Sequence, residues 1–297
     1  MQDQQKKLVL VDADGLVYHS SKNTLEESIN ILDEKIQNIF IKTEATHYVF
    51  FISKDKYFRH NIDPLYKSNR SKYPTQLKWI KTLKSYLIEN WNAQWMDLME
   101  SDDLIAYWIN NDLKENILDD DITYFDKILV SPDKDLLQSI PGKNFNYTYK
   151  LKDDIKALVK EDVMYQIQEE DVIKGWWIET SIEDSLKWQS FQLISGDAGD
   201  NVITPFPENC GIFNNKLDSH EILHGYIWGM YYETPSGQKK TIDGLGRSKG
   251  VYEFQKNYRL LHLLDCNDDF MREIGRLPEF PIITEIQKLN EEIKIDF

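Results

Sequence analysis

The chain has 297 residues, of which 41% are hydrophobic and 12% aromatic, and its formal net charge is -15. This length fits one large domain or two small ones, and the apolar content excludes general disorder. The negative charge argues against a nucleic-acid ligand unless cations neutralise the acids locally and the bases lie elsewhere, so the distribution of charge matters more than its sum.

The ends and the cysteines of the chain predict a cytoplasmic protein with no membrane contact. Only four consecutive apolar residues precede Asp12, too few for the apolar region of a signal peptide, and no stretch approaches the length of a membrane span. Cys210 and Cys266 have no CxxC spacing, which favours a reducing compartment and two inert thiols.

Three apolar strands alternate with amphipathic helices in the first half of the chain. The strands lie in residues 8–11, at the start of residues 46–59, and in residues 127–130, while helical periodicity spans residues 25–41 and 102–118. This alternation predicts an α/β fold with a mostly parallel central sheet and helices on its faces. Ligands of such sheets bind beyond the carboxyl ends of the strands.

The second half has a different pattern and is predicted to be mainly helical. Helical patterns occur in residues 153–168, 185–195, 251–265 and 281–293. Residues 202–250 are less regular, and residues 231–241 (YYETPSGQKKT) are typical of a hairpin or loop. We therefore expect an α/β core over residues 1–160 and a mainly helical region over residues 161–297.

Acidic residues gather at the ends of the predicted elements, in four clusters. The clusters are Asp12 with Asp14; Glu100 with Asp102 and Asp103; Asp133 with Asp135; and Asp197 with Asp200. Each cluster alone has a simpler explanation, because acids also cap helices and mark turns. Carboxylates brought together repel unless cations hold them, and oxygen ligands without His or Cys select Mg²⁺ or Mn²⁺. Two such ions about 4 Å apart stabilise the attacking and leaving oxygens of phosphodiester hydrolysis.

A basic segment without acids runs from Pro64 to Ile88. Its cationic side chains are Lys67, Arg70, Lys72, Lys78, Lys81 and Lys84. Beside a metal cluster, this segment is predicted to follow a nucleic-acid backbone, with Tyr66 or Tyr73 free to stack on bases. The alternative is an ordinary solvated helix face.

Together these segments resemble the 5′-nuclease family. The segments LVLVDADG, FR…YKSNR, ESDDLIA, VSPDKDL and SGDAGDN occur in the order and spacing of flap endonucleases and 5′-3′ exonucleases, over roughly residues 8–201. Among its members, the phage 5′-3′ exonucleases and phage ribonuclease H look most similar to this chain, in the segments KYFRHNIDPLYKSNR and YEFQKNYRLLHLLD. The resemblance implies a PIN-like nuclease core, a helical arch at about residues 64–99, and a carboxy-terminal region that completes the active site and binds duplex DNA.

The resemblance also implies two Mg²⁺ or Mn²⁺ ions and assigns their ligands. The first ion would be held by Asp12, Glu100, Asp102, Asp103 and Asp133, and the second by Asp135, Asp197 and Asp200 with Asp133 as their neighbour. Asp14 has no clear counterpart among the family's metal ligands, so a structural or supporting role is the simpler expectation for it. The family usually places an aspartate directly after the second strand, but Ile52 and Ser53 occupy that place here, and Asp55 is the candidate to replace it.

Two groups of DNA contacts follow from the resemblance. Lys67 and Arg70 would contact the scissile phosphate, and Lys67 would stabilise charge that develops on it. The family's duplex contact is a glycine-rich helix–hairpin–helix that often holds K⁺. Its best match here is the segment with Gly244, Gly246, Arg247 and Lys249, for which an ordinary surface turn is the alternative.

The expected function is therefore a metal-dependent 5′-3′ exonuclease or flap endonuclease that cuts near 5′ ends of branched or nicked DNA and RNA–DNA duplexes and removes RNA primers. A catalytically weakened DNA-binding protein on the same fold and a PIN-type ribonuclease are the alternatives. Expected partners are the nucleic acid and, at the level of the family alone, a replication clamp or a single-strand-binding protein; the chain itself is expected to be a monomer.

Overall fold

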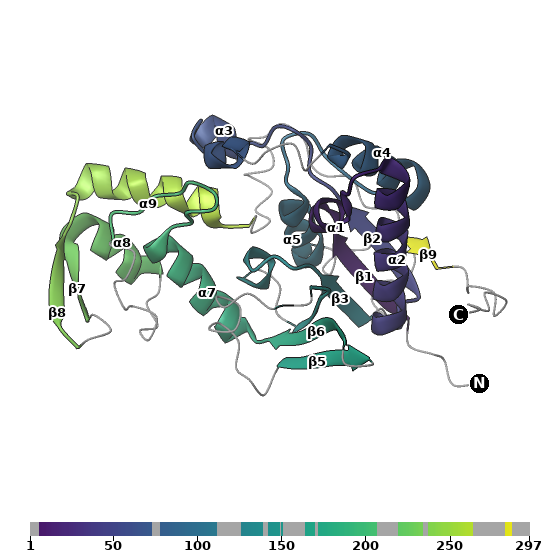
Figure 1. The fold of residues 1–297 in the computed structure, drawn as a ribbon. Helices are drawn as coiled ribbons and strands as arrows, with labels where there is room; N and C mark the ends of the chain where they lie inside the picture. The colour runs from purple at the N-terminus through teal and green to yellow at the C-terminus, as the bar shows by residue number, and fades with distance from the viewer. Residues whose placement is uncertain are drawn as a thin grey trace.

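The computed structural model describes residues 6–72, 78–111, 126–138, 142–148, 150, 164–169, 172–206, 219–233, 237–263 and 283–286. Within these ranges the chain forms a mixed α/β fold around a seven-stranded sheet of order β5-β6-β4-β3-β1-β2-β9, with a separate two-stranded ribbon, β7-β8 (Figure 1). This confirms the predicted fold class. No helix of the described part is long and apolar enough to cross a membrane.

The centre of the sheet is parallel and its margins are antiparallel. Strand β1 (Lys7–Asp12) pairs in parallel with β2 (His47–Phe51) and with β3 (Asp126–Val130), and β3 pairs in parallel with β4 (Gly142–Asn146). Because parallel strands end at one edge, the segments after β1, β2 and β3 come together there.

Strand β1 is buried on both faces, which explains its continuous apolar run. Val9 and Val11 face a core that contains Leu32 and Ile36 of α2 (Leu25–Thr43), and helix α1 (Ala13–Ser20) packs against the same core. Leu8 and Leu10 point to the other face, against α5 (Ser101–Asn111). Thr24 caps α2 by accepting a hydrogen bond from the Glu27 amide at 3.1 Å.

Two short helical segments and one longer helix lie between β2 and α5. They are α3 (Arg59–Ile62), the 3₁₀ helix η1 (Ser68–Lys72) and α4 (Ile80–Trp91). Helix α4 buries Leu83 and Leu87 in the core beside α2.

The segment after β4 is less helical than the sequence predicted. Strands β5 (Met164–Glu169) and β6 (Val172–Thr180) form an antiparallel pair that extends the sheet, so the helix expected at residues 164–168 is wrong. The helix expected at residues 281–293 is wrong where it is described, because β9 (Thr284–Glu285) pairs with β2. The boundary at residue 160 stays a prediction.

Three helices form a second body beside the sheet, with the ribbon at its far end (Figure 1). They are α7 (Ile182–Ser195), α8 (Ser219–Trp228) and α9 (Arg247–Leu261); the ribbon strands β7 (Gly229–Glu233) and β8 (Lys239–Asp243) connect α8 to α9. This confirms the hairpin expected at residues 231–241. Ile222, Tyr226 and Leu260 belong to the core of this body.

Candidate active site

The first acidic position lies at the end of β1, where Asp12 is both the last strand residue and the cap of α1. Its carboxylate accepts hydrogen bonds from the Ser101 hydroxyl at 2.8 Å and the Ser131 hydroxyl at 3.0 Å. Burial, followed by the charges of Asp14 and Asp133, raises the pKa of Asp12 to about 7. Because burial and neighbouring acids make the ionised form of Asp12 unfavourable, a bound cation would stabilise its carboxylate.

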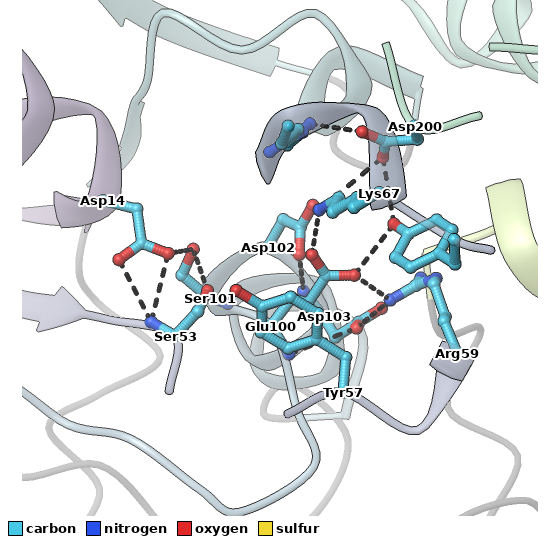
Figure 2. Close-up of polar contacts among 12 residues, drawn as sticks. Asp14, Ser53, Tyr57, Arg59, Lys67, Glu100, Ser101, Asp102, Asp103 and Asp200 are labelled. Carbon is cyan, nitrogen blue, oxygen red and sulfur yellow. Dashed lines mark hydrogen bonds and ion pairs between the residues drawn. The ribbon is translucent and has the colours of Figure 1, made fainter. Parts of the chain in front are cut away.

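Asp14 follows two residues later, and its side chain reaches Ser53 beyond the end of the neighbouring strand (Figure 2). Both of its carboxylate oxygens lie 3.2 Å from the Ser53 amide nitrogen, and one lies 2.8 Å from Lys84 Nζ. Asp55, the candidate for a ligand after β2, lies elsewhere: its side chain is 84% exposed and pairs with Lys81 at 3.5 Å. The structure therefore does not support Asp55 as a metal ligand.

A second acidic group surrounds the start of α5. Glu100, Asp102 and Asp103 each offer a carboxylate oxygen within 4.8 Å of the others, a spacing that could hold a metal ion. Burial and the charges of Glu100 and Asp103 raise the pKa of Asp102 well above its usual value. The amide of Asp103 donates to Asp102 at 2.8 Å, which fixes the Asp102 side chain at the amino-terminal end of the helix.

Arg59 is the main feature of the site that the sequence reasoning missed. Its five N–H groups donate to Glu100, to both oxygens of Asp103, and to the backbone carbonyls of Leu260 and His262. Arg59 and Asp103 are 1% and 0% exposed. Both oxygens of Asp103 are paired with Arg59, and both oxygens of Glu100 also have partners, so the metal-ligand roles of these acids stay predictions. The signal in the sequence is weak: Arg59 belongs to the FR pair before the basic segment, which does not reveal its partners.

Two cations of the basic segment, Lys67 and Arg70, contact the acids directly (Figure 2 labels Lys67). Lys67 Nζ pairs with Glu100 and lies 3.6 Å from Asp200, while the Arg70 guanidinium pairs with Asp200. Burial opposes the charged form of Lys67, but Glu100, Asp200 and Asp102 outweigh it and raise its pKa. Burial opposes ionisation of Glu100, but the charges of Lys67 and then Arg59 outweigh it and lower the pKa of Glu100. Lys67 is therefore a permanent cation within the acidic site.

Tyr66 does not match its predicted role. The ring is 4% exposed, and its hydroxyl lies 3.0 Å from a Glu100 oxygen and 2.9 Å from an Asp200 oxygen, so it can donate to either carboxylate. A ring held in this way is not free to stack on a base, so the expectation that Tyr66 stacks on nucleic acid is wrong. Its hydroxyl instead joins the acid at the start of α5 to the acid after α7. Tyr73 lies outside the described residues.

The remaining acids lie after β3 and after α7. The Asp133 amide donates to Ser131 at 2.9 Å, and the Asp135 amide donates to Asp133 at 3.1 Å, so the turn after β3 presents both carboxylates. Asp197 accepts from the Asp200 amide at 3.2 Å. Burial, then Asp133 and Asp197, raise the pKa of Asp135 well above its usual value, which shows that these acids form one electrostatic unit. Burial also raises the pKa of Asp200, with Lys67 and Arg70 opposing it.

The other predicted DNA contacts are more scattered. Lys84 points to Asp14, Lys81 to Asp55, and Lys78 lies 4.4 Å from the centre of the Trp79 ring. The backbone of Lys72 belongs to η1, and its side chain lies outside the described part. The described lysines of the basic segment are therefore divided between the acidic site and the exterior surface.

The glycine segment before α9 closes a helix–ribbon–helix rather than a short helix–hairpin–helix. A Cβ on Gly244 would lie 2.3 Å from the Ile227 carbonyl oxygen, so only glycine fits there. The Leu245 and Gly246 amides donate to carbonyls at the end of α8, at 2.9 and 3.0 Å, and are not available to a phosphate. Arg247 and Lys249 lie in the first turn of α9, whose own amides lack acceptors within the helix.

The fold and the site define an α/β protein with a carboxylate cluster suited to divalent cations at the carboxyl edge of its sheet. Residues 7–174 match the sequence model of the family described as 5′-3′ exonuclease, N-terminal resolvase-like domain. This match covers more than half of the chain, and the chain belongs to that family.

Two solved structures from bacteriophage T5 share the fold. One is a flap endonuclease in a pseudo-enzyme–product complex with DNA and metal ions, and the other is a T5 protein co-crystallised with metal ions. Each has 17% sequence identity and a TM-score of 0.55, and the matches cover 86% of this chain and 89% of the other. No curated protein matches the chain in sequence. The predicted membership of the 5′-nuclease family, with the phage enzymes as similar members, is thereby confirmed.

Proposed function

We propose that this protein is a divalent-metal-dependent, structure-specific 5′-3′ exonuclease and flap endonuclease. Its substrates would be branched or nicked DNA and RNA–DNA duplexes with 5′ ends, including RNA primers. The observation that carries the proposal is the meeting of acids from β1, α5, the turn after β3 and the segment after α7 with two cations, Lys67 and Arg70.

The donor set fits divalent ions, because it consists of carboxylate oxygens, and burial beside other acids raises the pKa values of Asp12, Asp102 and Asp135. Asp12, Asp133, Glu100 and Asp102 would hold one ion; Asp135, Asp197 and Asp200 would hold the other. Bound Mg²⁺ would activate water for attack and neutralise charge on the phosphate.

Lys67 and Arg70 would bind the phosphate on which the chemistry occurs. In the structure Lys67 pairs with Glu100, and Arg70 pairs with Asp200. When divalent ions neutralise those acids, both cations can turn to a phosphate oxygen, where a fixed ammonium and guanidinium stabilise the added negative charge. The 5′ end of the substrate would then lie against the acidic edge of the sheet.

The test is cleavage of a synthetic 5′-flap duplex with Mg²⁺, by the natural chain and by Asp133→Asn. We expect short 5′-phosphorylated products, no activity with EDTA, and loss of about 10²-fold or more in turnover in the variant. Asp126→Asn is the matched control, because Asp126 begins the same strand and pairs with Lys143 at 2.9 Å, away from the site.

Three results distinguish the rival functions. Cleavage that survives EDTA, or that Asp133→Asn leaves intact, overturns the metal mechanism. Tight flap binding without turnover in either Mg²⁺ or Mn²⁺ identifies a DNA-binding protein on a nuclease fold. Preference for single-stranded RNA over the flap duplex identifies a PIN-type ribonuclease.

A further inference from the structure

The carboxyl edge of the sheet has a gap in its row of acids. Asp12 ends β1 and Asp133 follows β3, but Ile52 and Ser53 follow β2, which pairs with β1. Ile52 and Ser53 are 1% and 3% exposed, so both lie within the site's wall and not on the surface. The edge therefore provides a buried position where the local sequence supplies no charge.

Asp14 fills this gap from the neighbouring segment. Its two oxygens lie 3.2 Å from the Ser53 amide nitrogen, which is the donor that ends β2. The Ser53 hydroxyl accepts from the Ser101 amide at 2.8 Å and lies 3.3 Å from the Ser101 hydroxyl. The carboxylate of Asp14 thus lies at the end of β2, although its residue belongs to α1 (Figure 2).

The Asp14 carboxylate is also part of the same polar group as Asp12. The Ser101 hydroxyl lies 2.8 Å from Asp12 and 3.4 Å from Asp14. A hydroxyl has one proton and can donate it to only one of them at a time. The two carboxylates are therefore neighbours that share an incomplete set of donors, and a cation between them would satisfy both.

A cation already occupies the outer side of Asp14. Lys84 Nζ lies 2.8 Å from Asp14 Oδ1 and donates to the Ser53 carbonyl at 2.6 Å. Lys84 comes from α4, and its side chain is only 24% exposed. The end of β2 thus has two oxygen atoms, one carboxylate and one carbonyl, that hold a positive charge.

We propose that Asp14 is the divalent-cation ligand at the end of β2, beside Asp12, and that Lys84 is the internal cation that neutralises Asp14 when no divalent ion is bound. Binding of the ion and the Lys84–Asp14 ion pair compete for the same carboxylate. This inference rests on the proposed function, since it assigns a ligand to the metal site of that function.

The experiment measures Mn²⁺ binding by the full chain without DNA, from the loss of the free-ion electron paramagnetic resonance signal. Asp14→Asn should weaken binding of one ion by about tenfold or more, because a carboxylate charge is lost at the ion. Lys84→Met should strengthen binding, because the competing cation is removed. Asp55→Asn is the matched control and should leave the affinity unchanged, as Asp55 is exposed.

A variant that moves the carboxylate tests whether Asp14 binds the metal ion or only forms the ion pair that anchors Lys84. In Asp14→Ser combined with Ser53→Asp, the carboxylate moves to the position after β2 whose side chain already faces Ser101. We expect recovery of most of the lost Mn²⁺ affinity. If Asp14 only anchors α4, then Asp14→Asn and Lys84→Met would both leave Mn²⁺ affinity unchanged, and the proposal is overturned.

The outcome can be distinguished from failure of the proposed function. Mn²⁺ binding that depends on Asp14 in a protein that never cleaves flap DNA supports the ligand and refutes the nuclease. Cleavage that depends on Asp133, with Mn²⁺ affinity indifferent to Asp14, supports the nuclease and refutes the ligand. Urea unfolding of each variant shows that the fold is intact.

Discussion

Replacing Arg59 by methionine should be among the most destabilising single changes in this chain. Arg59 neutralises Asp103, and both side chains are almost fully buried. Methionine fills a similar volume but leaves the Asp103 carboxylate without a counter-charge, which typically costs about 3 to 5 kcal/mol. The carbonyls of Leu260 and His262 lose their donors as well. Urea unfolding at pH 7 without divalent ions measures the loss in the free energy of unfolding.

Two further variants test whether the isolated charge is the cause. Arg70→Met removes another cation paired with an acid, but its side chain is 55% exposed, so we expect a loss below about 1 kcal/mol. Arg59→Met combined with Asp103→Leu should be more stable than Arg59→Met alone by about 2 kcal/mol, since no buried charge is left unpaired. A loss below about 1 kcal/mol in the single variant, or strictly additive effects in the double variant, refutes this reasoning.

Three more predictions concern the acids and the ribbon. Without divalent ions the free energy of unfolding should fall as pH rises from about 4 to 7. In this range the folded chain keeps a proton on Asp12 that the unfolded chain has lost, because the pKa of Asp12 is raised from 3.8 to about 7. This shift corresponds to a loss on the order of 4 kcal/mol. Asp12→Asn should flatten that dependence in urea titrations at pH 5 and pH 8, and an unchanged slope contradicts the assignment. Tyr66→Phe should cost about 2 kcal/mol in the same assay, because Glu100 and Asp200 lose the buried hydroxyl donor that they share; a neutral effect would show that water replaces the hydroxyl. Gly244→Ala should speed hydrogen exchange at the amides that join α9 to α8, since the added Cβ would meet a carbonyl oxygen at 2.3 Å, and unchanged exchange would show that the junction can adapt.

The strand ends were predictable because two simple signals coincide there. A short apolar run identifies each buried strand, and acids directly after it are conspicuous in Asp12 and Asp133. Parallel pairing then brings these acids to one edge, whatever the details of the helices. The fold class and the family followed from the same residues.

The contacts that the sequence did not predict depend on distant partners. Arg59 is one arginine among many basic residues until Asp103 and the Leu260 carbonyl lie around it. The sequence also does not show that Asp14 lies at the end of β2, because the approach of its carboxylate to Ser53 depends on the turn into α1. Local propensity does not contain either interaction.

The misassigned strands have a similar explanation. Residues 164–168 are too short a run for periodicity to distinguish a helix from a strand. They form a strand because they pair with β6. Thr284 and Glu285 form a strand because the outer edge of β2 offers unpaired backbone groups.

The Arg59 contacts also impose an order on the maturation of the chain during synthesis. Leu260 and His262 emerge from the ribosome some two hundred residues after Arg59. Until they arrive, two donors of a buried guanidinium have no acceptors, and the acids at the start of α5 lack a fixed support. A translation product that stops short of α9 would therefore carry every acid of the site and still lack the two carbonyls that hold Arg59 against them.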